Sequence, residues 1–294
     1  MDLSARAISA FTLLLLVIRL GAEEPVRFEV PFQIEKDDGV IFVKGSINGG
    51  SPQLFILDTG ATETIITPPA AEALGIHGQS AWGGDPVTKV NSISVGGATV
   101  SDVTVFVFDP PQALSLRLNR GINYNGILGC SFLSQFVITI DYQKKILIFI
   151  PHQNKQSSGE NKTDTSTDEI PFEVVNNHIH VKGWVNKKGP LTLLFDTGAT
   201  ATLLTQYTAR RFGIGGTPLI SPPGAFFTDL DSLSVGRTVI KKMPIIIYDP
   251  PQASGIEYNG ILGYTFMSRF LVTIDYRRKI LTLAPYENRN ETAH

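Results

Sequence analysis

Two aspartates in this sequence each begin the same tripeptide, Asp-Thr-Gly, at Asp58 and at Asp196. A single copy indicates little, because a polar turn after a strand often has this composition. Two copies offer two carboxyl groups for one site. Hydrolysis of a peptide bond requires a base that activates water and an acid that protonates the carbonyl oxygen, and two facing carboxyl groups that share one proton provide both. We therefore predict a hydrolytic dyad in which the ionised member takes a proton from water.

Such a dyad requires two equivalent halves, and the chain repeats itself. The segment from Gly126 to Pro151 is identical to the segment from Gly260 to Pro285 at 15 of 26 aligned positions. The interval between the two Asp-Thr-Gly motifs is close to the interval between the two Gly-Ile-Leu-Gly segments, so the copies differ by short insertions in loops. A duplication of this kind predicts two homologous lobes.

The hydrophobic runs of each lobe are short, rich in β-branched residues and bounded by Gly, Pro, Asn or Asp, which is typical of strands. Helix is expected over Pro68–Leu74, over its counterpart Tyr207–Phe212, and for one turn after each Gly-Ile-Leu-Gly. We therefore predict an all-β fold class with few and short helices.

Around these motifs the sequence resembles the retropepsin-like aspartic peptidases, whose Asp-Thr-Gly-Ala loop is followed by a flap and by an Ile-Leu-Gly segment that leads into a short helix and a final strand. The resemblance covers nearly all of both lobes, and pepsin-like enzymes use the same two-lobe arrangement in one chain. It implies two retropepsin-like β-barrel lobes with the active-site cleft between them. It also implies an aspartic-type endopeptidase that acts on peptide or protein substrates without a cofactor or metal.

The resemblance assigns supporting roles to the residues that follow each aspartate. Thr59 and Thr197 would cross-link the two loops, and Gly60 and Gly198 would let backbone amides approach the carboxylates.

The next position departs from the pepsin-like pattern, because Ala61 and Ala199 stand where those enzymes usually have Ser or Thr. The missing hydroxyl removes one hydrogen bond that would stabilise the carboxylate form. We therefore expect a mildly acidic pH optimum.

Two segments occupy the place of the family's flaps, Gly78–Asn91 and Gly215–Asp231. The candidate tip residues are Trp82 with Gly83 and Phe226 with Phe227. Ordinary packing of an aromatic side chain within the lobe explains these residues equally well. The lobes differ most in these segments, which predicts an asymmetric cleft.

The segment from Met1 to Ala22 has the pattern of a signal peptide, with Arg6 before an apolar run and Gly21-Ala22 after it. We expect cleavage after Ala22 and no stable membrane insertion of the mature chain, since the run is shorter than the roughly 20 residues that span a bilayer. The predicted domains are a lobe over 23–151, a polar linker over 152–168 and a lobe over 169–294. The mature protein is then expected in the periplasm or outside the cell, without room for an inhibitory pro-segment.

Composition excludes several other kinds of partner and site. A formal net charge of -2 gives no broad reason to bind nucleic acid. The only cysteine, Cys130, cannot form an intrachain disulfide and is expected to be a buried thiol.

His178 and His180 have the spacing of a strand-borne metal pair. Because Val40 and Phe42 occupy the aligned positions, we expect solvent-facing histidines without a metal.

Four further aspartates recur in both lobes at predicted turns, and a structural role is expected for them: Asp109, Asp249, Asp141 and Asp275.

Two alternatives to a single-chain enzyme remain at this point. One is a non-catalytic peptide-binding module on the same scaffold, against which the two intact Asp-Thr-Gly motifs argue. The other is a homodimer in which lobes pair between chains. A monomeric pseudo-dimer is the simplest arrangement.

Overall fold

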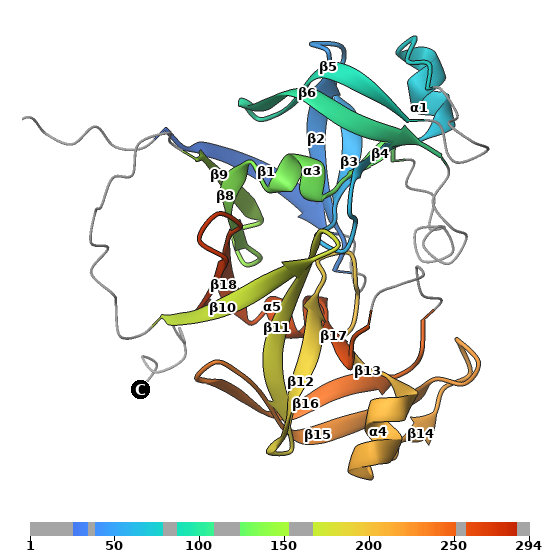
Figure 1. The fold of residues 1–294 in the computed structure, drawn as a ribbon, viewed down its shortest axis with the longest axis vertical. Helices are drawn as coiled ribbons and strands as arrows, with labels where there is room; N and C mark the ends of the chain where they lie inside the picture. Colours follow the sequence, from blue (N-terminus) through green and yellow to red (C-terminus); the bar gives the residue numbers. More distant parts are fainter. Residues whose placement is uncertain are drawn as a thin grey trace, which may run out of the picture.

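A computed structural model of the chain describes residues 26–34, 39–78, 87–108, 124–152, 167–250 and 257–286. Strands predominate, the helices are short, and two lobes with the same order of elements lie above and below one another in Figure 1. This confirms the all-β, two-lobe fold. The predicted signal peptide lies outside the described residues. Among the helices of the described ranges, none is long and apolar enough to cross a membrane.

The N-terminal lobe contains these elements: β1 (Phe28–Ile34), β2 (Ile41–Ile47), β3 (Gln53–Leu57), β4 (Thr64–Ile66), α1 (Pro68–Ala73), β5 (Val87–Val95), β6 (Ala98–Val107), β7 (Gly126–Leu128), α3 (Cys130–Leu133), β8 (Phe136–Asp141) and β9 (Ile146–Pro151). The C-terminal lobe contains their counterparts and one additional short strand: β10 (Asp168–Val175), β11 (His178–Val185), β12 (Lys188–Phe195), β13 (Leu203–Leu204), α4 (Gln206–Phe212), β14 (Thr217–Pro218), β15 (Phe226–Val235), β16 (Thr238–Ile247), β17 (Gly260–Leu262), α5 (Tyr264–Met267), β18 (Phe270–Asp275) and β19 (Ile280–Pro285).

Each lobe closes six strands into a barrel. In the N-terminal lobe the order around the barrel is β2, β3, β7, β4, β6, β5 and back to β2. The same circuit in the C-terminal lobe is β11, β12, β17, β13, β16, β15 and back to β11. The strand before each Asp-Thr-Gly motif therefore lies parallel to the Gly-Ile-Leu strand of its own lobe, and the barrel fixes both.

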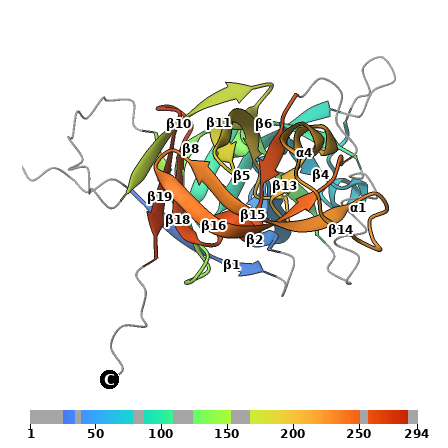
Figure 2. The same ribbon diagram turned by 90° about the horizontal axis from the view of Figure 1, so that it is seen from below.

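A shared sheet joins the two lobes. Its strand order is β1, β9, β8, β18, β19, β10, and the lobes meet at the antiparallel pair β8–β18 (Figures 1 and 2). Thr139 faces Thr273 at the centre of this pair, with 2.9 Å between their hydroxyl oxygens. Equivalent residues thus meet across the centre of the molecule, as expected of a pseudo-two-fold arrangement.

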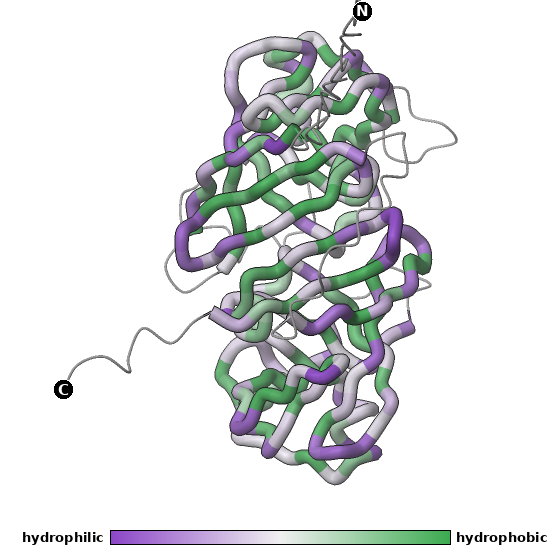
Figure 3. Tube along the Cα trace, turned by 90° about the vertical axis from the view of Figure 1, so that its left-hand side faces the viewer, coloured by the Kyte–Doolittle hydropathy of each residue, from purple (hydrophilic) through white to green (hydrophobic). Residues whose placement is uncertain are grey.

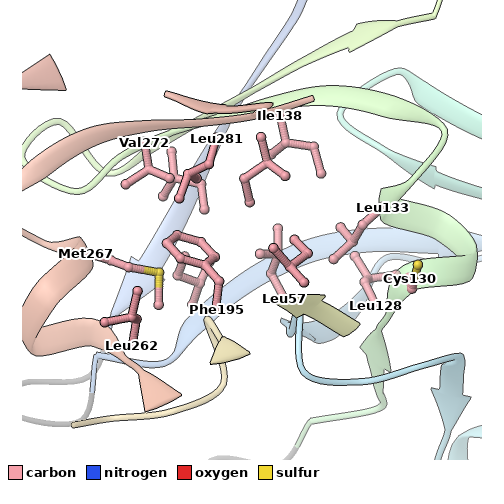
Figure 4. Packing of buried hydrophobic residues seen from close by; sticks show 14 of the residues in the cluster. Leu57, Leu128, Cys130, Leu133, Ile138, Phe195, Leu262, Met267, Val272 and Leu281 are labelled. Carbon is pink, nitrogen blue, oxygen red and sulfur yellow. The ribbon is translucent and has the colours of Figure 1, made fainter. Parts of the chain in front are cut away.

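One hydrophobic core runs through both lobes beneath the shared sheet (Figure 4). Apolar and polar residues alternate along many strands, and polar residues gather in the turns (Figure 3). Leu57 and Phe195, the residues directly before the two motif aspartates, are fully buried in this core. Because Leu57 and Phe195 are fixed in the core, the two Asp-Thr-Gly loops begin at well-anchored strand ends.

The expectation of solvent-facing histidines on β11 is wrong. His178 and His180 are 4% and 8% exposed, and the Nδ1 atom of His178 and the Nε2 atom of His180 have no hydrogen-bond partner among the described residues. β11 pairs with β10 on one side and with β12 on the other, which leaves it central in its sheet. The aligned Val40 and Phe42 are buried core residues in the other lobe, so the repeat itself carried the signal of burial.

Replacing His180 with phenylalanine, the residue that Phe42 provides in the other lobe, should make stability less sensitive to acid. Burial lowers the pKa of His180, the charges of His178 and Lys182 lower it further, and Glu173 acts in the opposite direction. The unfolded chain takes up this proton near pH 6.5, so wild-type stability falls as the pH drops below about 6.5 toward the lowered pKa of the folded state.

Urea unfolding of His180→Phe at pH 7.5 and pH 5 should show a smaller difference in unfolding free energy than the wild type. The variant should also gain about 1 kcal/mol at pH 7.5, because a buried nitrogen without a partner is removed. The exposed His77, changed to phenylalanine, controls for the loss of one imidazole. A pH dependence in His180→Phe equal to that of the wild type would contradict the assignment.

Candidate active site

The two Asp-Thr-Gly loops leave the barrels at matching points. Asp58 follows β3 and its backbone N–H donates to the carbonyl of Leu128 at 3.1 Å. Asp196 follows β12 and its N–H donates to the carbonyl of Leu262, also at 3.1 Å. Each aspartate is therefore tied to the Gly-Ile-Leu strand beside it, and both carboxylic side chains are half-buried.

Two buried threonines link the loops. The hydroxyl of Thr59 donates to the Phe195 carbonyl at 2.8 Å and accepts from the Thr197 N–H at 3.0 Å. In the reverse direction, the hydroxyl of Thr197 donates to the Leu57 carbonyl at 2.9 Å and accepts from the Thr59 N–H at 2.9 Å. Both threonines are almost completely buried, at 0% and 1% exposure. Four reciprocal hydrogen bonds inside the core hold the loops in one relative position.

The glycines bring each loop against the carboxyl group of the other. A Cβ atom added to Gly60 would lie 2.6 Å from the Cγ of Asp196, and one added to Gly198 would lie 2.6 Å from the Cγ of Asp58. The N–H of Gly60 also donates to Asp58 Oδ1 and that of Gly198 to Asp196 Oδ1, each at 2.8 Å. The two aspartates therefore face each other across the glycines, one from each lobe.

This arrangement raises the pKa of Asp58. The pKa of Asp58 is well above its ordinary value, mainly because of burial. The negative charge of Asp196 and a side-chain hydrogen bond between the two carboxyl groups raise it further, while the N–H groups of Gly60 and Ala61 lower it. Two carboxyl groups in this relation retain one proton between them at a pH where an isolated aspartate would have lost it.

A second layer of hydroxyl groups supports both loops and was not anticipated from the sequence. The Ser131 hydroxyl donates to the Thr64 hydroxyl oxygen at 3.0 Å. In return, the backbone N–H of Thr64 donates to the Ser131 hydroxyl oxygen at 2.9 Å. Thr202 and Thr265 repeat this pair in the C-terminal lobe, at 3.1 and 2.9 Å. The recurrence of Thr six residues after each aspartate, and of Ser or Thr after the Gly-Ile-Leu-Gly segment, is the sequence signal that could have found this layer.

The alanines of the motif have a backbone role. The N–H of Ala61 donates to the Asp58 carbonyl at 3.3 Å and the N–H of Ala199 to the Asp196 carbonyl at 3.2 Å, which closes each turn. Their own carbonyls accept from the first residue of the helix that follows, Cys130 or Tyr264. Cys130 is buried, as expected.

Tyr258 is a further residue near the dyad that the sequence did not single out. Burial is the main cause of its raised pKa, and the charge of Asp196 contributes next. It packs against a small apolar cluster that contains Ala199 and Leu194. Tyr124 takes the same place in the N-terminal cluster, with Ala61.

The prediction of Phe226 and Phe227 as flap tips is wrong in its position. Both residues lie within β15, where they pair with Pro218 and Thr217 of β14. The hairpin turns between these strands, and Ile220 in the turn is 99% exposed. Phe226 and Phe227 therefore lie in a paired strand and not in the turn of the hairpin. Trp82 and Gly83 lie outside the described residues.

Three of the four recurring aspartates have the structural roles expected of them. Asp141 accepts from the Lys144 N–H, and Asp275 accepts from the N–H groups of Arg277 and Arg278. Asp249 accepts from the N–H of Gln206 at the start of α4. Asp109 is outside the described residues. Within the described ranges, no group of three or more His, Cys, Asp or Glu residues could hold a metal ion.

Comparison with known proteins gives a family model and similar structures for the chain. A family model described as Aspartyl protease matches the chain twice, over residues 43–132 and 181–266. Basic 7S globulin from soybean superposes with a TM-score of 0.53 at 11% identity, over 89% of this chain and 95% of that one, which shows a shared fold. A retropepsin-like aspartic protease from Rickettsia conorii gives a TM-score of 0.32 at 22% identity, over 43% of this chain and 90% of that one. No curated protein matches the chain.

Proposed function

The chain belongs to the aspartyl protease family, and from this membership we propose that it is an aspartic endopeptidase whose catalytic dyad is Asp58 and Asp196. The observation that carries the proposal is the mutual approach of the two carboxyl groups, each packed against the glycine of the opposite loop. Both groups come from one chain, which favours a monomeric enzyme over pairing between two copies.

The proposed mechanism uses the single proton of the pair. The ionised carboxyl group removes a proton from a water molecule, which attacks the carbonyl carbon of the scissile bond. The protonated carboxyl group donates to the carbonyl oxygen, so that a neutral tetrahedral diol forms and the pair still carries one proton. Collapse of this intermediate transfers a proton to the leaving nitrogen. The reciprocal hydrogen bonds of Thr59 and Thr197 join the two loops, so they hold the two carboxyl groups in one relative position during the reaction.

We propose export of the mature protein as well, on the basis of the charged and apolar pattern of residues 1–22. A periplasmic or extracellular enzyme of this kind would act on peptides or proteins present there. The lone cysteine fits that environment, since folding then depends on no disulfide.

The main rival is a peptide-binding protein without turnover. The soybean structure bears the name of a globulin, and a shared fold does not specify an activity. Digestion of a diverse peptide library between pH 3 and pH 8 separates the two functions. The peptidase proposal requires cleavage that is blocked by a peptide in which a hydroxyethylene group replaces the scissile amide, since this group resembles the tetrahedral intermediate. Peptide binding without any cleavage would support the rival.

The alanine of each motif sets an expected pH dependence. In Ala61→Ser, a hydroxyl group would add a hydrogen bond to the ionised form of the dyad and lower the pKa of the pair. The acidic limb of kcat/KM should then move to lower pH by roughly half a unit to one unit. The exposed Ala73, changed to serine, is the matched control. A limb that stays in place or moves upward would contradict this role, as would a wild-type optimum below about pH 3.

A further inference from the structure

A groove outside the catalytic loops has a composition of its own. It has a volume of about 740 Å³ and lies in the C-terminal lobe, where the start of β10, the first half of β16, and the ends of the β18–β19 hairpin meet. None of its lining residues belongs to an Asp-Thr-Gly loop, so the dyad does not account for it.

Three basic residues surround this groove, Arg237, Lys241 and Arg269, and all three are exposed. The one acidic residue in its lining, Asp168, is already neutralised. Its Oδ2 accepts from the N–H groups of Arg237 and Thr238 at 2.7 Å each, and its Oδ1 accepts from the Arg237 guanidinium at 3.3 Å. Because this ion pair uses the charge of Arg237, the positive charge that remains available to a ligand comes from Lys241 and Arg269.

The fold does not require these charges, as the other lobe shows. When the two copies of the repeat are aligned, Gly97 takes the position of Arg237 and Ser101 that of Lys241. Gln135 takes the position of Arg269. The same part of the N-terminal lobe thus forms the same strands without a basic residue at any of the three sites. Arg237 holds Asp168 in place, but the shared fold does not account for the positive charges of Lys241 and Arg269.

The groove also offers a strand edge. β16 pairs with β15 along its length, but it pairs with β13 only at Ile246 and Ile247. Over Thr238–Pro244 no second strand in the described part of the chain pairs with it. Val239 on this edge is 58% exposed, and the exposed Pro285 also lines the groove. An unpaired strand edge is the surface to which extended peptides add as a further strand.

We propose that this groove binds an extended acidic peptide segment along the free edge of β16, with its carboxylates on Lys241 and Arg269. The strand edge favours a polypeptide over other polyanions, because a nucleic acid or sulfated glycan has no backbone that can continue a sheet. The site goes beyond the proposed peptidase activity and does not depend on it. In an active peptidase it would direct cleavage toward proteins with acidic segments.

Fluorescence anisotropy on the full chain tests this proposal. The probe is a labelled ten-residue peptide that alternates Glu with Val, and Asp58→Asn serves as the background so that the peptide is not cut. The analogue with Gln in place of Glu should bind at least about tenfold more weakly. Raising the salt concentration should weaken binding of the acidic peptide, since exposed charges are screened.

The variant Lys241→Ser with Arg269→Gln should weaken binding of the acidic peptide about five- to tenfold. Both changes install the residues of the N-terminal lobe, so they should leave the melting temperature unchanged. The control variant Lys89→Ser with Arg211→Gln removes the same two charges at exposed positions away from the groove and should bind as the parent does.

Three results would overturn the proposal. They are equal affinity for the Glu and Gln peptides, an equal loss in the control variant, and tighter binding of a single-stranded oligonucleotide of the same charge than of the acidic peptide. Failure of the library digestion described above would leave this binding result intact, because anisotropy requires no turnover.

Discussion

Replacing either carboxyl group of the dyad by an amide, as Asp58→Asn or Asp196→Asn, should lower kcat/KM for peptide cleavage by at least about 10³-fold. An amide can neither take the proton from water nor donate one at the required acidity, and the pair loses the proton that it shares. Each change should be nearly as damaging alone as both together, because the two groups act as one unit.

The same variants should not unfold the protein. The pKa of Asp58 is raised in the folded state, so the folded state loses stability as the pH rises from the unfolded value, about 4, through the raised folded value. Asp58→Asn should therefore have a higher unfolding free energy than the wild type at pH 7, and the difference should shrink as the pH falls and be absent below about pH 4. Loss of cleavage together with gain in stability distinguishes a catalytic role from a structural one.

The exposed Asp231, which pairs with Lys242 at 2.9 Å, is the matched control. Asp231→Asn should cleave peptides at the wild-type rate. Cleavage that persists in both dyad variants would place the chemistry on other residues, and the proposed function would then need different groups.

Much of this fold was predictable from the repeat. The predominance of strands agrees with expectation, because short β-branched runs between turn residues have few alternatives, and so do the two longer helices and the turn of helix after each Gly-Ile-Leu-Gly. The approach of Asp58 to Asp196 was also predictable as a geometry, since a duplicated half-site has one symmetric way to complete itself. These features are local or follow from the symmetry of the repeat.

The remaining features depend on packing that the residue types do not reveal. Polarity alone favours exposure of the two β11 histidines, whereas their aligned residues Val40 and Phe42 indicate burial. Aromatic residues such as Phe226 suit a flap tip and a strand equally, and only the pairing with β14 places Phe226 in a strand. The hydroxyl groups of Thr64 and Ser131 belong to residues far apart in the chain, so only their recurrence as Thr202 and Thr265 in the other lobe could have indicated the contact.

Gly60→Ala should abolish most activity through a single methyl group. The new Cβ would lie 2.6 Å from both the Cγ and the Oδ1 of Asp196, closer than non-bonded atoms approach. The carboxyl group can rotate or shift away, but its partner in the dyad then lies at the wrong distance, and a misplacement of about 1 Å costs roughly 10²-fold in rate. We expect a loss in kcat of at least about 10²-fold, with a fall of about 1–3 kcal/mol in unfolding free energy from the overpacking.

Gly198→Ala should lower kcat as much as Gly60→Ala does, because its Cβ would lie at the same 2.6 Å from Asp58. An equal loss in the two variants tests whether both loops serve one site. Gly215→Ala is the control, since a Cβ there has no neighbour within 4 Å and its backbone is not in the left-handed region. Steady-state kinetics and urea unfolding on the three variants separate the effects. If Gly60→Ala cleaved at the wild-type rate while Gly198→Ala did not, the two carboxyl groups would not be working as a symmetric pair, because a mirrored steric clash must displace either aspartate alike.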